Sequence, residues 1–149
     1  MKNSIYDTLI FENQEIRFQK IAVFELINLH FGITDSAWIL IDQGTIYILP
    51  YSENNFIGFY KILELNFEDF LNSFLVDQKE IIRYFPLDKI TMSVFQSESN
   101  YWLGLCLNLL KALDYGQESI VYNNQNRNTT WISQENIHKI KSLAKKPSH

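Results

Sequence analysis

The chain has 149 residues, of which 46% are hydrophobic, 15% aromatic and 20% charged, and its formal net charge is −4. A chain of this length can bury a core of its own, and this composition excludes an intrinsically disordered protein. The only cysteine, Cys106, excludes an intramolecular disulfide and metal motifs built from cysteine pairs, so we expect a reducing, cytoplasmic environment.

Apolar runs rich in β-branched and aromatic residues indicate strands in the first 65 residues. The clearest two are residues 37–42 and 45–50. Because only Gln43 and Gly44 separate them, these runs can pair only in the antiparallel direction.

Three further elements are predicted in the same part of the chain. Residues 4–11 match a strand, and residues 56–65 match another strand that follows a turn. Residues 21–32 match a helix that ends at Gly32.

From residue 66 onward the hydrophobic period becomes that of helices. Asn66 is a candidate helix cap, and one face of the segment that follows is apolar, with Phe67, Phe70, Leu71, Phe74 and Leu75. Residues 79–85 predict a short helix that ends before Pro86. Residues 87–95 fit both periods, and we favour a helix.

Two longer helices are predicted toward the end of the chain. Residues 97–116 contain the longest apolar run without charge, and the last helix begins at the candidate cap Ser133. Ile132 can pack against Ile137 across this cap as a hydrophobic staple. Between the two helices, the Asn-rich residues 122–130 predict a loop.

These patterns predict an α+β fold, with an antiparallel sheet in the N-terminal half, helices packed on it and a helical C-terminal half. We expect one globular domain over residues 1–149, strand-rich over residues 1–65 and helix-rich over residues 66–149.

Cys106 is predicted to lie in the core. On an ideal helix, the polar residues of the segment 97–116 fall within one arc of about 80°: Asn100, Gly104, Asn108 and Lys111. Cys106 lies on the opposite, apolar side. Burial there raises the pKa of a thiol and disfavours the thiolate, which is the nucleophilic form.

The histidines and glycines match no motif for catalysis or metal binding. His30, His138 and His149 are not spaced with another ligand, and the five glycines are too scattered for a phosphate-binding loop. We therefore predict a protein that is not an enzyme, with no catalytic residue, metal site or cofactor.

An enzyme of unknown class remains an alternative. It would use either Cys106 or the carboxylates Glu64, Glu68 and Asp69, since grouped carboxylates can act as an acid and base pair or bind Mg²⁺. Acidic residues at the start of a helix are also favoured by capping and by the helix dipole, and we prefer that explanation.

Charge is distributed unevenly along the chain. Residues 1–80 carry 12 acidic and 5 basic residues, a net charge of −7, whereas residues 81–149 carry 5 and 8, a net charge of +3. The lysines near the C-terminus fit the negative end of a helix dipole and need no nucleic acid to explain them. Because the acidic half repels phosphate groups, we expect a basic protein partner and no nucleic-acid partner. The longest uncharged segment, residues 99–110, is shorter than the roughly 18 residues of a membrane helix, so no membrane partner is expected.

Acidic residues interspersed with aromatic residues predict a protein-binding surface. Carboxylates of this number cannot be buried unpaired, and tyrosines are enriched among the residues that dominate binding at interfaces. The predicted partner-binding residues are Asp42, Tyr51, Glu53, Tyr60, Glu64, Glu68 and Asp69.

The acidic half and the stretches "NFEDFLNSFL" (residues 66–75) and "NYWLGLCLNLL" (residues 100–110) give the chain a character that resembles bacterial immunity proteins, which neutralise polymorphic or contact-dependent toxins. The resemblance implies tight stoichiometric binding to a cognate toxin domain, often a basic one and often a nuclease. It transfers no functional residue by position. The predicted function is therefore a non-enzymatic, protein-binding toxin inhibitor, and the alternative is a helical scaffold or adaptor that binds a peptide or protein.

Overall fold

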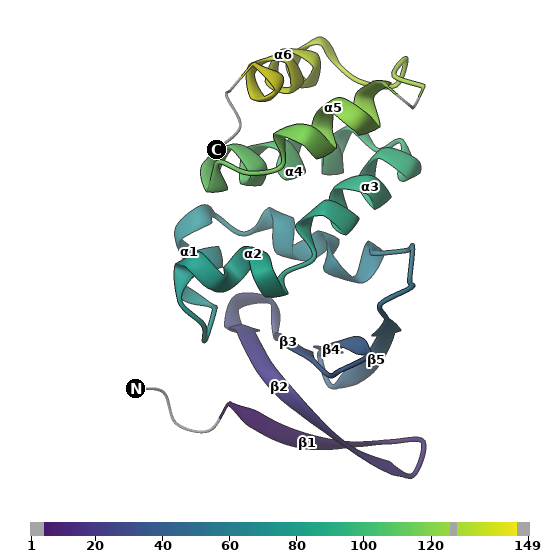
Figure 1. Cartoon of the computed structure of the whole chain (residues 1–149), viewed down its shortest axis with the longest axis vertical. Helices are drawn as coiled ribbons and strands as arrows, with labels where there is room; N and C mark the ends of the chain where they lie inside the picture. Colours follow the sequence, from purple (N-terminus) through teal and green to yellow (C-terminus); the bar gives the residue numbers. More distant parts are fainter. Residues whose placement is uncertain (1–4, 126–127, 146–149) are drawn as a thin grey trace. The chain divides into compact units, whose positions relative to one another are not determined.

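Five antiparallel strands in the N-terminal half and helices in the remainder confirm the predicted α+β class (Figure 1). The computed structural model describes residues 5–125 and 128–145. Its contacts divide the chain into two units. We name them the sheet unit, Met1–Glu53 with Glu68–Phe85, and the helical unit, Asn54–Phe67 with Pro86–His149. That the chain forms one domain stays a prediction.

The strands follow one another across the sheet in chain order. They are β1 (Tyr6–Phe11), β2 (Gln14–Phe24), β3 (Leu29–Ile33), β4 (Ala37–Asp42) and β5 (Thr45–Pro50). Two-residue turns with positive φ angles, at Glu12 and Asn13 and at Gln43 and Gly44, join β1 to β2 and β4 to β5. Such turns match the twist of a hairpin. The predicted strands at residues 4–11, 37–42 and 45–50 are thus confirmed as β1, β4 and β5.

The predicted helix at residues 21–32 is wrong. This segment holds the second half of β2, the short 3₁₀ helix η1 (Glu25–Ile27) and β3. The register of β2 against β3 shifts between Lys20 and Ala22, and two consecutive residues, Ile21 and Ala22, are buried. A bulge of this kind breaks the alternation of a strand and produces a hydrophobic pattern that is easily mistaken for the helical period.

The predicted strand at residues 56–65 is also wrong. The structure has a 3₁₀ helix there, η2 (Ile57–Glu64), in which Phe59, Tyr60, Ile62 and Leu63 are buried. A short, continuous apolar run fits a buried strand and a buried helical segment equally well, so periodicity alone does not separate them.

Phenylalanine side chains form much of the core of the sheet unit. Their contacts confirm the prediction that helices pack on the sheet. The helices of this part of the chain are α1 (Phe67–Asn72), η3 (Gln78–Glu80) and α2 (Ile81–Tyr84). Phe70 of α1 lies 6.3 Å from Phe24 of β2, and Phe85, just after α2, lies 6.0 Å from Phe31 of β3, measured between ring centroids. The predicted apolar face from residue 67 to 75 extends beyond α1, which ends at Asn72. Phe74 instead forms a strand-like bridge with Ala22.

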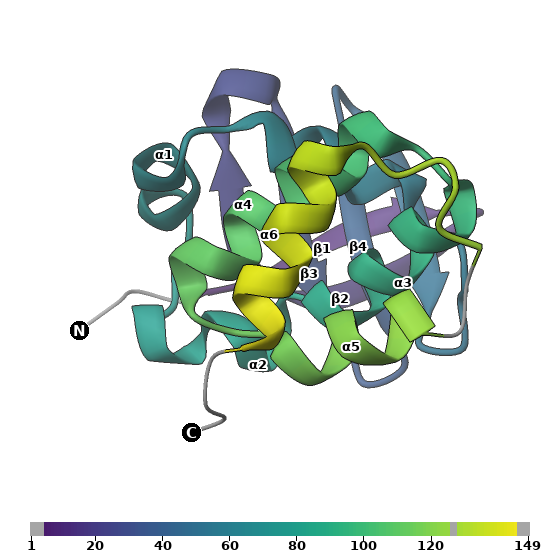
Figure 2. The ribbon, with the colours of Figure 1, turned by 90° about the horizontal axis from the view of Figure 1, so that it is seen from above.

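The described residues of the helical unit also form the helices α3 (Leu87–Ser97), α4 (Asn100–Leu113), α5 (Gln117–Gln125) and α6 (Gln134–Ala144). Helix α6 lies across α4 and α5 (Figure 2). The predicted helices at residues 79–85, 87–95 and 97–116 are confirmed. The cap at Ser133 is confirmed as well, since its hydroxyl accepts a hydrogen bond from the Asn136 N–H. None of the described helices combines the length and the hydrophobicity of a membrane-spanning segment.

The predicted loop at residues 122–130 is wrong over its first four residues, which belong to α5. Residues 126 and 127 lie outside the described residues, and residues 128–130 are not helical. Asn123 is buried, and its side-chain amide donates to the Ser119 carbonyl oxygen at 2.8 Å. The composition of this segment predicts a loop, but Asn123 is held inside the helix by a local hydrogen bond.

The polar arc predicted on residues 97–116 is not wholly a solvent face. Asn108 is exposed, whereas Asn100 is half-buried against α6. The Asn136 amide donates to the carbonyl and side-chain oxygens of Asn100 at 3.0 and 2.9 Å, and Asn100 Oδ1 also accepts from the Ser133 N–H at 2.8 Å. At Asn100 the arc is therefore a hydrogen-bonded contact between two helices.

Candidate protein-binding groove on the sheet

Strand β2 changes its partners along its length. Residues Gln14–Gln19 pair with β1, and residues Gln19–Phe24 pair with β3. On the side away from β3, the second half of β2 is covered by residues 73–75. The Val23 N–H donates to the Ser73 carbonyl oxygen at 2.9 Å, and the Leu75 N–H donates to the Ile21 carbonyl oxygen at 2.8 Å.

The first half of β2 has β1 on one side only. The Lys20 N–H donates to the Ile5 carbonyl oxygen, on the β1 side, at 2.6 Å. Because backbone groups alternate between the two sides of a strand, the N–H and C=O groups of Glu15 and Arg17 point away from β1. Strand β3 ends at Ile33, so within residues 5–125 and 128–145 no strand pairs with Glu15 and Arg17 on that side.

A hollow of about 600 Å³ lies beside this unpaired edge. We name it the sheet groove. It is bounded by the first half of β2 and by the turn from Thr34 to Ser36, and its apolar lining includes Ile16, Phe18, Ile39 and Ile48. All of these residues belong to the sheet unit.

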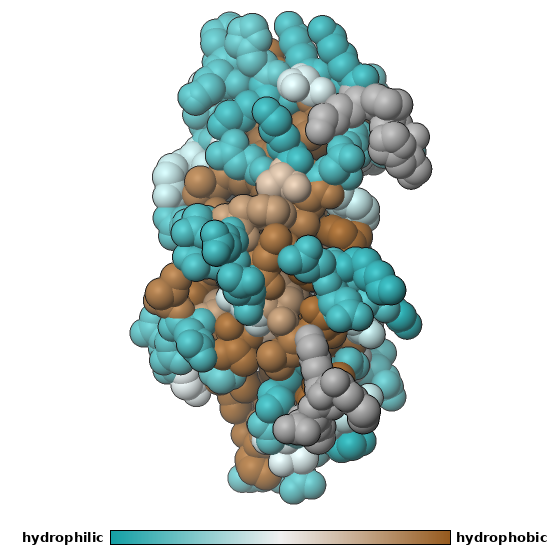
Figure 3. Space-filling model, turned by 90° about the vertical axis from the view of Figure 1, so that its left-hand side faces the viewer, coloured by the Kyte–Doolittle hydropathy of each residue, from teal (hydrophilic) through white to brown (hydrophobic). Residues whose placement is uncertain are grey.

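The curl of the sheet supplies the apolar floor of the groove. Leu9 of β1, Phe18 of β2 and Ile39 of β4 form one buried cluster, although β1 and β4 are not neighbours in the sheet. Ile16 and Ile48 pack against this cluster and are only partly buried. The hairpin of β1 and β2 also has an apolar residue outside the groove, Ile10, which is 63% exposed. Figure 3 shows hydrophobic atoms at the surface of this hairpin, at the bottom of the view.

The turn on the far side of the groove is held by hydrogen bonds. Thr34 Oγ1 accepts from the N–H groups of Ser36 and Ala37 at 3.2 and 3.1 Å. The Tyr51 hydroxyl donates to the Thr34 carbonyl oxygen at 2.5 Å, and the Tyr51 ring packs edge-on against Trp38 at 4.7 Å. Partial burial, and then the nearby Asp35 carboxylate, raise the pKa of Tyr51, which keeps the hydroxyl protonated as a donor. These contacts therefore hold this side of the groove in place without a bound partner.

Three charged residues surround the groove. The Arg17 guanidinium carbon lies 4.2 Å from the centre of the Tyr6 ring, in a cation–π contact. Glu15 and Asp35 are exposed, and they form no ion pair with any described residue. The rim of the groove thus has two carboxylates that are available to an incoming cation.

Among the predicted partner-binding residues, Tyr51 shapes this groove. Glu53 follows two residues later, and Asp42 lies at the other end of β4; both are half-buried. Both belong to the sheet unit. The early end of β3, which exposes the edge of β2, cannot be predicted from the sequence pattern, because the pattern of residues 21–32 predicts a helix there.

Tyr60 cannot be a direct partner contact in this structure, which corrects the prediction. Its side chain is 4% exposed, its hydroxyl shares a 2.7 Å hydrogen bond with Ser93 Oγ, and its ring lies 5.3 Å from Trp102. Tyr60 lies on the buried face of η2, where the sequence pattern predicts a strand.

The carboxylates of the enzymatic alternative lie on two elements. Glu64 ends η2, where its Oε2 accepts a 2.5 Å hydrogen bond from the Tyr101 hydroxyl. This hydrogen bond raises the pKa of Tyr101. Glu68 and Asp69 lie in the first turn of α1, as the helix dipole favours. In the part of the chain that the structure describes, no three His, Cys, Asp or Glu side chains are grouped as a metal site would require.

Cys106 is fully buried, as predicted. Burial raises the pKa of its thiol to about 11, although a hydrogen bond with the Thr91 hydroxyl, 3.4 Å from the sulfur, acts in the opposite direction. At neutral pH the thiol is protonated and inaccessible, so it does not support nucleophilic chemistry.

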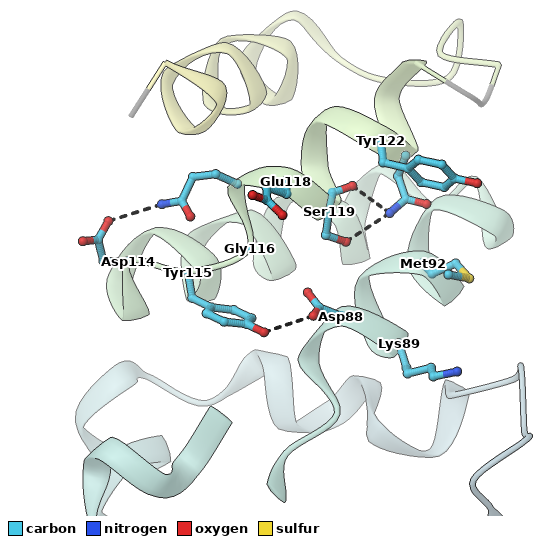
Figure 4. A pocket seen from close by; sticks show the side chains of 11 residues that line it. Asp88, Lys89, Met92, Asp114, Tyr115, Gly116, Glu118, Ser119 and Tyr122 are labelled. Atoms are coloured by element: carbon cyan, nitrogen blue, oxygen red, sulfur yellow. Dashed lines mark hydrogen bonds between the residues drawn. The ribbon is translucent and has the colours of Figure 1, made fainter. Parts of the chain in front are cut away.

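A second hollow of about 600 Å³ lies in the helical unit, between α3 and α5 (Figure 4). Its lining includes the carboxylates of Asp88, Asp114 and Glu118, and the Tyr115 hydroxyl donates to Asp88 Oδ2 at 3.0 Å. Burial, together with Asp88, raises the pKa of Tyr115. Among the described residues, its lining includes no histidine or cysteine.

Comparison with protein-family models, with curated proteins and with solved structures finds no match for this chain.

Proposed function

We propose that this protein is a non-enzymatic inhibitor that binds a basic protein through its sheet unit. The observation that carries the proposal is the sheet groove, which joins an apolar floor, a backbone edge and two carboxylates, and no described residue pairs with that edge or with those carboxylates. Protein interfaces typically combine an apolar core with a polar rim.

The charge of the sheet unit favours a basic partner. Its sequence holds 11 acidic and 5 basic residues, a net charge of −6, whereas the helical unit holds 6 and 8, a net charge of +2. Complementary charge accelerates association and excludes partners of the same sign. The acidic unit is thus suited to attract a basic protein at a distance, and the groove is suited to hold it.

The partner that we propose is a bacterial toxin domain, with this chain as its cytoplasmic immunity protein. The support is the resemblance in whole-chain character, together with the acidic sheet unit. The enzymatic alternative with Cys106 gains no support, because burial keeps that thiol protonated. The helical scaffold or adaptor differs in a measurable way, since it would bind several partners weakly.

The test begins with affinity capture from the native cell and identification of the captured protein by mass spectrometry. The purified partner is then titrated with this chain, and both are expressed together in a host whose growth the partner arrests. We expect a 1:1 complex with a nanomolar or lower dissociation constant and restored growth. Several partners that bind weakly would support the adaptor, and tight binding without restored growth would contradict an inhibitor.

A further inference from the structure

We propose that the sheet groove takes an extended segment of the partner, which adds to β2 as a strand and forms hydrogen bonds with the backbones of Glu15 and Arg17. The inference rests on the proposed function for the source of the segment, but not for the mode of binding. Strand addition of this kind obtains affinity from backbone hydrogen bonds and specificity from alternate side chains.

The edges of β2 have four parts, and the described residues of the chain cover three of them. Strand β1 covers one side of the first half, β3 covers one side of the second half, and residues 73–75 cover its other side. The last of these is an internal example of the proposed contact, with two backbone hydrogen bonds around the bridge between Ala22 and Phe74. The fourth part, at Glu15 and Arg17, faces the sheet groove.

Side chains of an added strand would alternate between two environments. One set would lie over Ile16 and Ile48, which are only partly buried, so an aliphatic side chain there buries apolar surface. The other set would point outward beside Glu15 and Arg17, which lie on the opposite face of β2 from Ile16 and Phe18. An apolar residue is therefore expected at every second position.

The carboxylates of Glu15 and Asp35 favour a basic segment. Arg17 is stacked on Tyr6, whereas Glu15 and Asp35 have no ion pair within the described part of the chain. A lysine or arginine flanking the apolar residue would face these two carboxylates. We thus infer a segment of about five residues in which aliphatic and basic residues alternate, without proline at the positions that donate hydrogen bonds.

The test uses the capped peptide acetyl-Lys-Val-Lys-Val-Lys-amide with the full ¹⁵N-labelled protein. We expect the largest amide shifts at Glu15 and Arg17, and exchange of both amides with solvent slowed at least tenfold at saturation. Peptides that are N-methylated at one position each should show an alternating effect, because only every second peptide N–H faces β2. Shifts elsewhere, or equal losses of affinity at every N-methylated position, would overturn the inference.

A pair of protein variants locates the peptide. Ile16→Asp places a charge on the floor of the groove, and it should weaken peptide binding at least tenfold. Leu26→Asp changes an exposed apolar residue of η1 that lies outside the groove, and it should leave binding unchanged. Equal effects would overturn the inference, and if Ile16→Asp does not fold, the N-methylated peptides still decide on the wild-type protein.

Failure of this inference is distinguishable from failure of the proposed function. Tight 1:1 inhibition of the captured partner, with the Glu15 and Arg17 amides exchanging as in the free protein, would overturn strand addition alone. Peptide binding at these amides without any inhibited partner would support strand addition alone. Protection that increases with protein concentration in the absence of peptide, accompanied by dimers in sedimentation, would show that a second copy fills the groove and would overturn the inference.

Discussion

The Leu75 N–H donates to the Ile21 carbonyl oxygen at 2.8 Å, and this contact closes one side of the second half of β2. On the opposite side of the first half, the backbones of Glu15 and Arg17 have no such neighbour among the described residues, and the sheet groove lies there. Exposed strand edges promote association, and proteins normally cover or shorten them. The sheet groove beside this short edge therefore supports the proposed binding function.

The Tyr51 hydroxyl is expected to keep the groove in shape. Tyr51→Phe removes its hydrogen bond to the Thr34 carbonyl and should lower the free energy of unfolding by about 1 kcal/mol. Hydrogen exchange of the Ser36 and Ala37 amides should become faster. The control is Tyr47→Phe, because Tyr47 lies half exposed on β5, where it pairs with Leu40 of β4. Equal exchange in the two variants would show that Tyr51 does not hold the turn.

Gly32 is expected to be required where β2 and β3 begin to pair. A Cβ atom at this position would lie 2.6 Å from the Gln19 carbonyl oxygen and 2.6 Å from Phe18, so Gly32→Ala should lower the free energy of unfolding by about 3 kcal/mol. Gly44→Ala is the control. It meets no atom within 4 Å and carries only the strain of φ +87°, about 1 kcal/mol. Urea unfolding distinguishes the two costs, and a smaller loss for Gly32→Ala would contradict the tight approach of the strands.

Asn100 is expected to stabilise the contact between α4 and α6. Asn100→Ala leaves the Ser133 N–H and the buried Asn136 amide with fewer acceptors, so we expect a loss of about 2 kcal/mol in the free energy of unfolding. Asn108→Ala, on the exposed side of the same helix, should change it by less than about 0.5 kcal/mol. Similar losses in urea unfolding of the two variants would argue against this contact.

Cys106 should make stability fall with pH in the alkaline range. The unfolded chain ionises this thiol near its ordinary pKa of about 8.5, whereas the folded protein holds the proton until about pH 11. Between these values the unfolded state binds fewer protons, so Cys106 lowers the free energy of unfolding by up to about 1.4 kcal/mol per pH unit. Its contribution is complete below the lower value. The difference between wild type and Cys106→Ala isolates this slope, and parallel stability curves would show that the thiol is not buried.

The sequence predicts those elements whose local signals agree with their tertiary setting. The hairpin around Gln43 and Gly44 has the turn residues that its positive φ angles require, and Ser133 caps the helix that the pattern indicates. Cys106 is buried where its helical face places it. In these cases one short stretch of chain determines the outcome.

The groove depends on information that is not local. The bulge near Ile21 hides a strand behind a helical period, and the early end of β3 at Ile33 is visible only once the pairing of β2 is known. Tyr60 shows the same limit, because its burial follows from the 3₁₀ conformation of η2. The sequence therefore predicts an acidic, aromatic binding surface, but it does not predict which edge carries the groove.

The most direct measurement is the association rate of the captured partner with two charge variants of this chain. Glu15→Gln with Asp35→Asn removes two charges at the groove, and the control, Glu98→Gln with Glu118→Gln, removes two exposed charges in the helical unit. At low ionic strength the groove variant should associate roughly three- to tenfold more slowly than wild type and the control should not, with the difference disappearing at high salt. Equal rates for the two variants, or a wild-type rate that does not respond to salt, would contradict binding of a basic partner at the sheet groove.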